Sequence, residues 1–346
     1  MKVKKVLYLF TTLVLLLCLA NCSNIMYGLK QGAGQLKIVR EAESLDHFIG
    51  LKDYPDSLKQ KLLLVKEIKK YCQDSLKLLS GDNYGKMFDQ KGKPGMYVIT
   101  ASKEFELSSY QWSFPFLGKF SYKGYFDLEK AKKERAALDK EGYDTDLAQV
   151  NAWSTLGWFK DPVMSSMLRL SPGKLARVLI HEITHYNVFI KDDIQYNENL
   201  ASFIGDKGAR KFLIDKFGKN SKELNDFEIF LHDVELFTMY MMGKSMELSA
   251  YYKTLDTKNE HAATLKKEKI KAFILGLKEQ NFKSDKLVNR IVADADSINN
   301  TFFTDFLMYR KENGIMEKEY QEQFNGDINL FIDEQKRKYA KANGYK

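Results

Sequence analysis

The segment SPGKLARVLIHEITHYNVFI, residues 171–190, decides the fold. Ser171 before Pro172 is a favourable helix start, because a capping hydroxyl is followed by a proline in the first turn. Apolar side chains then recur at spacings of three and four, which predicts a helix over about 172–190 with one face toward a core. His181 and His185 are four residues apart, so they are neighbours on one face of that helix.

These histidines enclose Glu182 in the pattern HExxH. Their spacing lets two imidazoles reach one zinc ion at bond lengths of about 2.0–2.1 Å. Glu182 lies one step round the helix and reaches a water on the metal rather than the metal itself, as the general base does in zinc peptidases. The chain has only five histidines, and two of them fall in this pentapeptide. That favours a centre with one zinc per chain over two histidines that merely pack on a helix.

A catalytic zinc needs a third protein ligand and one open position. Residue 191 is a lysine, so the third histidine of the metzincin pattern is absent. The segment Asn197-Glu198-Asn199-Leu200-Ala201 precedes a second helical stretch, which is where gluzincins keep a ligating glutamate. Glu198 is therefore the predicted third ligand, and the two helices must turn tightly through 191–196. Asp193 remains a competing ligand, because its spacing to Tyr196 faintly resembles the aspzincin pattern.

The first residues have the composition of an export signal. Three lysines precede an apolar core, Val6 to Ala20, that is shorter than the ~20 residues of a spanning helix. The core ends in Leu19-Ala20-Asn21-Cys22, which resembles a bacterial lipobox, although Asn21 departs from the usual small residue. We expect residues 1–21 to be removed as a lipoprotein signal peptide. An ordinary cleaved secretory signal is the alternative.

Lipid on Cys22 would make this an exported protein that is anchored to the membrane of the bacterial cell envelope. Ser23 favours the outer membrane under the enterobacterial sorting rule. Radiolabelled palmitate should enter the wild type and should not enter Cys22→Ser. Equal labelling of the two proteins would contradict lipidation.

The composition restricts the partners, the disulfide bonds and the fold that the chain can have. The chain has 54 basic and 46 acidic residues spread along its length, without a polybasic tract, so a nucleic-acid partner is not expected. Apart from Cys22, the mature chain holds only Cys72, so no internal disulfide can form. We expect a predominantly helical α+β fold of the zincin-like metallopeptidase class, with a small mixed sheet before the HExxH helix.

The predicted domain is one zincin-like unit, 22–346. Its N-terminal part, 22–170, carries the sheet, and its helical part, 171–346, carries the zinc site. The hydrophobic pattern predicts a linker merging into a helix at 24–49 and helices at 56–79 and 128–140. It predicts strands at 96–101 and 146–153, an irregular aromatic stretch at 109–125 and mostly helix after 221.

Several stretches together resemble a family of predicted bacterial zinc aminopeptidases that look like lipoproteins. The resemblance covers nearly the whole mature chain and implies a zinc peptidase acting on a peptide substrate. This chain departs from the family pattern at Lys119, where a cysteine is common, and at Asn199, where a serine is common. The matching pieces are 27–36, Phe114-Pro115 with Gly118, 122–126, 153–159, Asp161-Pro162, 181–185, Asn197-Glu198 with Ala201, Gly205 with 208–210, and Asn299-Asn300 with Tyr309.

The gluzincin comparison also suggests two further kinds of residue. A Tyr or His would hydrogen-bond the tetrahedral oxyanion. Tyr309 is our choice, from its place after Asn299-Asn300, over His232, Tyr240, Tyr251 and Tyr252. The segment 151–157 occupies the place of the substrate-binding edge strand, with contacts from Ser154, Thr155, Leu156 and Gly157. An ordinary core strand is the alternative interpretation of this segment.

Other function classes stay open at this point. The protein could be an envelope lipoprotein that binds a partner and holds a non-catalytic zinc, although a structural site needs no general base such as Glu182. Within enzymes, an endopeptidase or a cell-wall amidase is the alternative to an aminopeptidase. Zinc content and hydrolysis of aminoacyl-arylamides and blocked peptides separate these cases.

Overall fold

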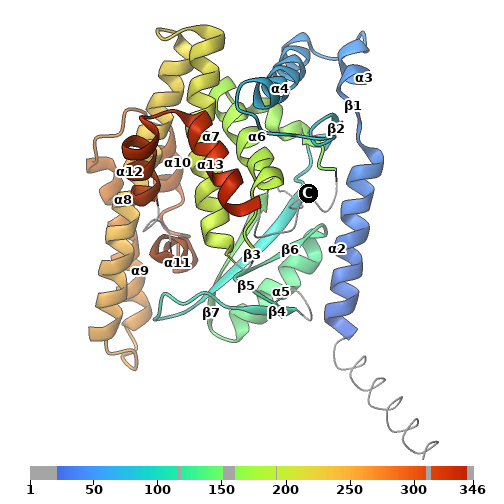
Figure 1. Cartoon of the computed structure of the whole chain (residues 1–346). Coiled ribbons are helices and arrows are strands. Elements are labelled where there is room, and N and C mark those ends of the chain that lie inside the picture. The colour runs from blue at the N-terminus through green and yellow to red at the C-terminus, as the bar shows by residue number, and fades with distance from the viewer. Residues whose placement is uncertain (1–21, 115–117, 151–159, 192, 309–312, 341–346) are drawn as a thin grey trace, which may run out of the picture.

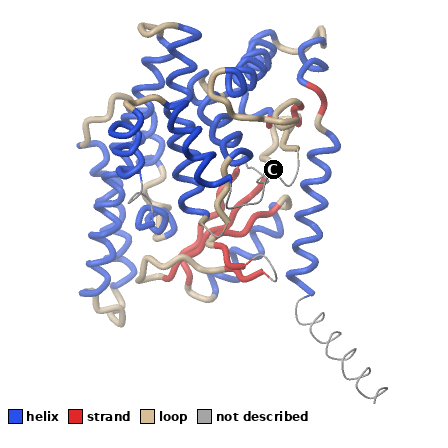
Figure 2. Tube along the Cα trace, viewed as in Figure 1, coloured by secondary structure: helices blue, strands red, loops and turns tan. Residues whose placement is uncertain are grey.

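The computed structural model of the chain describes residues 22–114, 118–150, 160–191, 193–308 and 313–340. Helices surround a small group of strands (Figures 1 and 2). The predicted class, α+β with helix predominating, is confirmed at that level. Within the described residues, no helix is both long enough and apolar enough to cross a membrane.

Helices make up most of the fold. The α-helices are α2 (Cys22–Glu41), α3 (Leu45–Gly50), α4 (Asp56–Asp74), α5 (Leu128–Lys140), α6 (Pro172–Asn187), α7 (Ile194–Phe217), α8 (Lys222–Thr254), α9 (Ala262–Leu275), α10 (Asp285–Ala293), α11 (Thr301–Met308), α12 (Asn313–Phe324) and α13 (Ile328–Ala340). Two 3-10 helices are η1 (Ser165–Arg169) and η2 (Gly276–Glu279). The strands are β1 (Glu43–Ser44), β2 (Lys86–Phe88), β3 (Met96–Lys103), β4 (Trp112–Phe114), β5 (Gly118–Phe120), β6 (Tyr122–Tyr125), β7 (Tyr143–Val150) and β8 (Val163–Met164).

The main sheet has the strand order β6-β3-β7 and is antiparallel throughout. Mixed pairing is confined to the small sheet β1-β2-β8, in which β2 and β8 run parallel. Alternation along β3 gives the main sheet two different faces. Ile99 and Ala101 point into a core beneath α5, whereas Thr100 faces the side of α10 and α11.

The aromatic stretch predicted as irregular forms strands instead. β4 and β5 make a hairpin in which Trp112 lies opposite Phe120, and β6 joins the edge of the main sheet. Each of these strands has only three or four residues, which is too short for an alternating pattern to identify it. The strand predicted at 146–153 begins earlier, at Tyr143, and its predicted end lies outside the described residues.

Helix α2 begins where the first part of 24–49 was predicted to be a linker merging into a helix, and it covers the outer edge of β6. Tyr27 and Gln31, one turn apart, both donate hydrogen bonds to the carbonyl oxygen of Gly124 at 2.7 Å. Gly34 continues this face, and an added Cβ there would lie 2.2 Å from the Phe126 ring. A covered edge cannot pair with another chain, so these three residues protect the sheet.

Three apolar cores hold the fold together. The largest contains α4, α6, α7, α12 and α13, and the second lies among α8, α9, α10 and α11. The third lies between the main sheet and α5. The HExxH helix α6 and its neighbour α7 therefore belong to the best-packed part of the molecule.

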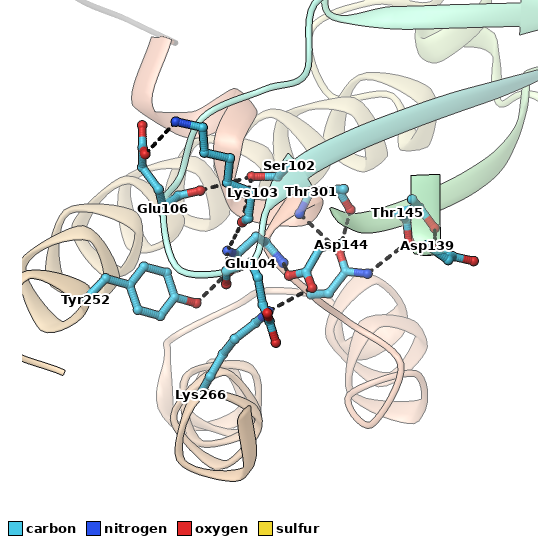
Figure 3. A network of polar contacts seen from close by, with 12 residues as sticks. Ser102, Lys103, Glu104, Glu106, Asp139, Asp144, Thr145, Tyr252, Lys266 and Thr301 are labelled. Carbon is cyan, nitrogen blue, oxygen red and sulfur yellow. Dashed lines mark hydrogen bonds and ion pairs between the residues drawn. The ribbon is translucent and has the colours of Figure 1, made fainter. Parts of the chain in front are cut away.

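A network of polar contacts joins Lys103, Glu104 and Asp144 at the end of the main sheet to Tyr252 and Lys266 of the later helices (Figure 3). Asn299 and Asn300 belong to this network. The fully buried Asn300 donates to the carbonyl oxygens of Lys103 and Glu104 at 2.8 and 2.9 Å. Its backbone N–H donates to Asp144 at 3.0 Å, and Tyr252 donates to its side-chain oxygen at 2.6 Å. The Asn-Asn pair therefore has a structural role.

Asp144 also holds Lys266 of α9 at 2.7 Å, with side chains only 15% and 8% exposed. Asp144→Ala should lower the free energy of unfolding by about 3–5 kcal/mol, because it leaves a buried ammonium without its partner. Asp296→Ala is the matched control, since Asp296 pairs with Lys271 of the same helix at 2.8 Å on the exposed surface. That change should stay within about 1 kcal/mol. Equal denaturant midpoint shifts for the two variants would contradict the prediction.

Candidate functional site

Helix α6 carries the HExxH residues on its outer face. It begins at Pro172, as predicted, but the Ser171 side chain forms no capping hydrogen bond within the described structure. Leu175, Leu179 and Ile180 are fully buried and fix the inner face in the largest core. The opposite face then presents His181, Glu182 and His185 to a cleft.

The tight turn predicted between the helices is held by Asn197. Its side chain accepts a hydrogen bond from the backbone N–H of Ile190 at 2.8 Å and donates one to the carbonyl oxygen of Ile190 at 2.7 Å. Asp193 is the N-cap of α7 and accepts from the N–H of Tyr196 at 3.0 Å. Glu198 follows one turn into α7, which directs its carboxylate at the two histidines.

His181, His185 and Glu198 converge as a triangle of possible metal ligands. The two Nε2 atoms are 3.2 Å apart, and they lie 3.3 and 3.4 Å from the two oxygens of Glu198. Four ligands arranged tetrahedrally at 2.0–2.1 Å from zinc lie about 3.3 Å from one another. Each of these spacings is close to that between two zinc ligands, although the two histidines face different oxygens of Glu198, and the donor set of two imidazoles and one carboxylate suits zinc. Asp193 is not part of it.

The surroundings keep the carboxylate of Glu198 ionised, as a metal ligand must be. Burial raises the pKa of Glu198, but hydrogen bonds from His181 and His185 outweigh this and hold the pKa well below its usual range. The carboxyl is therefore ionised near neutral pH. On the far side of the imidazole, Nδ1 of His181 lies 3.4 Å from the Ser202 hydroxyl of α7. Such an outer partner fixes the ring orientation of a metal-binding histidine.

The cleft beside the triangle has a volume of about 560 Å³ and two walls. One wall comes from α6 and α7, and the other comes from the β5–β6 region and Gln111. The lining residues in the described structure are Gln111, Lys119, Phe120, Ser121, Tyr122, His181, Glu182, His185, Phe189, Ile194, Gln195, Asn197 and Glu198.

Tyr122 is the cleft residue that the sequence analysis missed. The pKa of its phenol is raised, first because protein atoms withdraw it from water and second because Glu198 is near. The next residue, Lys123, points to the other side of β6 and donates to Glu134 of α5 at 3.0 Å, as does the Trp112 indole at 2.9 Å. Helix α5 therefore holds β4 and β6, on the cleft's second wall, from the side away from the cleft. Only the pairing of short strands brings Tyr122 here, and no spacing in the sequence reveals it.

Ser154, Thr155, Leu156, Gly157 and Tyr309 fall outside the described residues. Of the alternatives to Tyr309, two hydroxyls are used in packing: Tyr240 donates to the carbonyl oxygen of Phe273 at 2.7 Å, and Tyr252 donates to Asn300. His232 lies 3.1 Å from Asp233. None of these alternatives, nor Tyr251, lines the described cleft.

Close contact between α6 and α7 depends on Gly205. A Cβ at this position would lie 3.0 Å from the carbonyl oxygen of Arg177 and 3.3 Å from Cβ of His181. Another residue would therefore push α7 away from the helix that carries the histidines. Gly208 makes a similar approach to Ile180, one turn further along.

Gly205→Ala should destabilise the protein by about 1–3 kcal/mol, because its nearest neighbour is backbone and cannot move aside alone. Gly243→Ala in α8 is the matched control, since nothing lies within 4 Å of an added Cβ there. Alanine in that open position should be neutral or stabilising by up to about 1 kcal/mol. Urea unfolding of both variants measures the difference. Identical midpoints would show that the helix contact tolerates a side chain.

Comparison with known proteins adds one positive result. A family model described as "Putative aminopeptidase" matches residues 26–343, which is most of the chain. No curated protein and no solved structure gives a significant match.

Proposed function

Because the chain belongs to the "Putative aminopeptidase" family, we propose that it is a zinc-dependent aminopeptidase of gluzincin type. The observation that carries the proposal is the convergence of His181, His185 and Glu198, in which the two Nε2 atoms are 3.2 Å apart and each lies 3.3–3.4 Å from one oxygen of Glu198. A zincin-like arrangement of α6 and α7 would hold one zinc per chain at this point. The substrate would be a peptide lying in the cleft between these helices and β6.

The chemistry divides among three kinds of residue. Zinc held by the triangle would supply a Lewis acid that lowers the pKa of a water and polarises the scissile carbonyl. Glu182 takes a proton from the attacking water and delivers it to the leaving amine. Tyr122, across the cleft, donates its hydroxyl hydrogen to the developing oxyanion. A phenol has an ordinary pKa of about 10, so it is protonated near neutral pH, as this role requires.

The enzyme assay must distinguish the proposal from its alternatives. Purified protein is assayed on aminoacyl-arylamides and on N-blocked peptides, after chelation and again after zinc is restored. We expect cleavage of substrates with a free amine, loss on chelation and recovery with zinc. Cleavage of blocked peptides instead would indicate an endopeptidase or cell-wall amidase. Zinc binding without hydrolysis of any substrate would favour the non-catalytic binding protein.

Tyr122→Phe tests the oxyanion role within the same assay. Loss of one oxyanion donor should lower turnover by about 10²–10³-fold. The zinc content should stay unchanged, because the phenol is not a ligand. Unchanged turnover would remove Tyr122 from the mechanism and leave the zinc site itself unaffected.

We also propose that the enzyme is anchored to the cell envelope through lipid on Cys22. Helix α2 begins at this residue and docks on β6 a little further along, through Tyr27 and Gln31. The cleft would then be tied to the membrane anchor by one continuous helix of 20 residues. The palmitate experiment with Cys22→Ser tests the anchor independently of activity.

A further inference from the structure

The charged residues of the cleft differ in whether they already have a role or a partner. Within its described lining, Glu182 and Glu198 are the only acids, and both belong to the metal chemistry proposed above. Lys119 is the only lysine or arginine there. It is exposed and forms no ion pair within the described part of the chain. The described lining thus keeps a positive charge for a ligand and offers no acid beyond Glu182 and Glu198.

The backbone holds Lys119 in a defined place. It lies in β5, where it is paired with Ser113 of β4, and it precedes Phe120, which also lines the cleft. The described amides of the cleft already have protein partners. Asn197 closes the α6–α7 turn, and the side-chain N–H groups of Gln195 and Gln111 donate to Asn199 and to Ser109. Lys119 is therefore the cationic group of the described lining whose binding capacity is unused.

The size and the walls of the cleft suit a short peptide. Its volume of about 560 Å³ lies within the range of roughly 300–1,000 Å³ typical of small-molecule sites. Phe120, Phe189 and Ile194 give it apolar walls, and Ile194 is 59% exposed and open to contact. A ligand of this kind would place apolar groups on these walls and an anion at Lys119.

We propose that Lys119 binds a carboxylate of the peptide substrate and makes short, negatively charged peptides the preferred class. This rests on the proposed peptidase function. The carboxylate is either the C-terminus of a di- or tripeptide or an acidic side chain near the scissile bond. Lys119 acts on specificity through its ammonium group, which donates hydrogen bonds to the carboxylate.

The test compares tripeptides that differ only in charge. One has a free C-terminal carboxylate, the second is its C-terminal amide, and the third is an amide with glutamate in place of the neutral last residue. The wild type should prefer a charged peptide over the neutral amide by about tenfold in kcat/KM, mostly through KM, as one charge-assisted hydrogen bond allows. The first and third peptides show which carboxylate is recognised.

Three variants locate the effect. Lys119→Met should abolish the preference, and Lys119→Arg should retain most of it. Lys133→Met is the matched control, since Lys133 is an exposed lysine of α5 outside the cleft. It should keep the wild-type preference. Raising the ionic strength should weaken the preference in the wild type, because exposed charges are screened.

A binding measurement separates this proposal from the catalytic one. In the Glu182→Gln background, calorimetry with the charged and neutral tripeptides should give the same tenfold ratio in Kd, which disappears when Lys119→Met is added. An equal Kd for both peptides, or a preference that survives Lys119→Met, would overturn the role of Lys119. Absence of hydrolysis by the wild type, with the Kd ratio intact, would instead overturn the peptidase function alone.

Discussion

Glu182→Gln should keep about one zinc per chain and lose turnover by about 10²–10⁴-fold, the range of general-base catalysis. Glutamine keeps the shape of the side chain but cannot accept the proton from the attacking water. Glu182 lines the cleft on the same helix as both histidines, yet it is not part of the ligand triangle. The measurement is zinc content by atomic emission beside kcat and KM on a free-amine substrate.

The separation of kcat from KM decides how this variant is interpreted. Substrate affinity should change little, because the metal, the cleft walls and Lys119 remain. Thermal unfolding of the variant is the control for folding, and it should match the wild type. Full activity of Glu182→Gln on every substrate that the wild type cleaves would end the zinc-hydrolase mechanism.

Glu198→Ala should lose the metal as well as the activity. This carboxylate is one corner of the triangle, and its removal leaves two histidines, fewer protein ligands than the three typical of a catalytic zinc. His181→Ala and His185→Ala should behave in the same way. Metal analysis after dialysis against a weak chelator measures the loss, and circular dichroism shows whether the helices remain.

Asp193→Ala is the matched control for Glu198→Ala. Asp193 lies five residues earlier, at the start of the same helix, and caps it through the N–H of Tyr196. Its removal should reduce stability by about 0.5–2 kcal/mol, as the loss of an N-cap does, and should leave the zinc in place. If Asp193→Ala lost the metal while Glu198→Ala kept it, the ligand set would be the aspzincin-like alternative.

Local patterns in the sequence predicted the helices well. Helix α5 has the predicted bounds, because Asp127 caps it through two backbone N–H groups and Gly142 follows with a positive φ of 84°. The HExxH helix ends at Asn187, three residues before its predicted end, where the chain turns toward α7. His181, His185 and Glu198 could also be predicted to lie close together. That prediction needs only the helical periodicity and the short connection between α6 and α7, which are local properties of the sequence.

The second wall of the cleft depends on long-range pairing that local patterns do not contain. Tyr122 lies opposite Thr100 across two strands, and Lys119 lies opposite Ser113. Their approach to Glu198 requires the sheet, the hairpin and α7 to be assembled together. The same limit applies to Asn299 and Asn300, whose partners in and after the strands lie more than 150 positions earlier in the chain. From sequence, this pair indicated a functional neighbour for Tyr309, whereas its contacts are structural.

The Asn299-Asn300 contacts also bear on the order in which the chain can fold. They join residues that are 154 to 197 positions apart, from Thr145 to Asn299 and from Lys103 to Asn300. The sheet strands are synthesised long before residues 299 and 300. Asp144 and the carbonyl oxygen of Lys103 therefore cannot bond to Asn300 until most of the chain has been made. Loops of this length close slowly. The bonds that join this end of the sheet to Asn299 and Asn300 therefore form only after residue 300 has been made, whereas the ladder between β3, β6 and β7 needs no residue beyond 150.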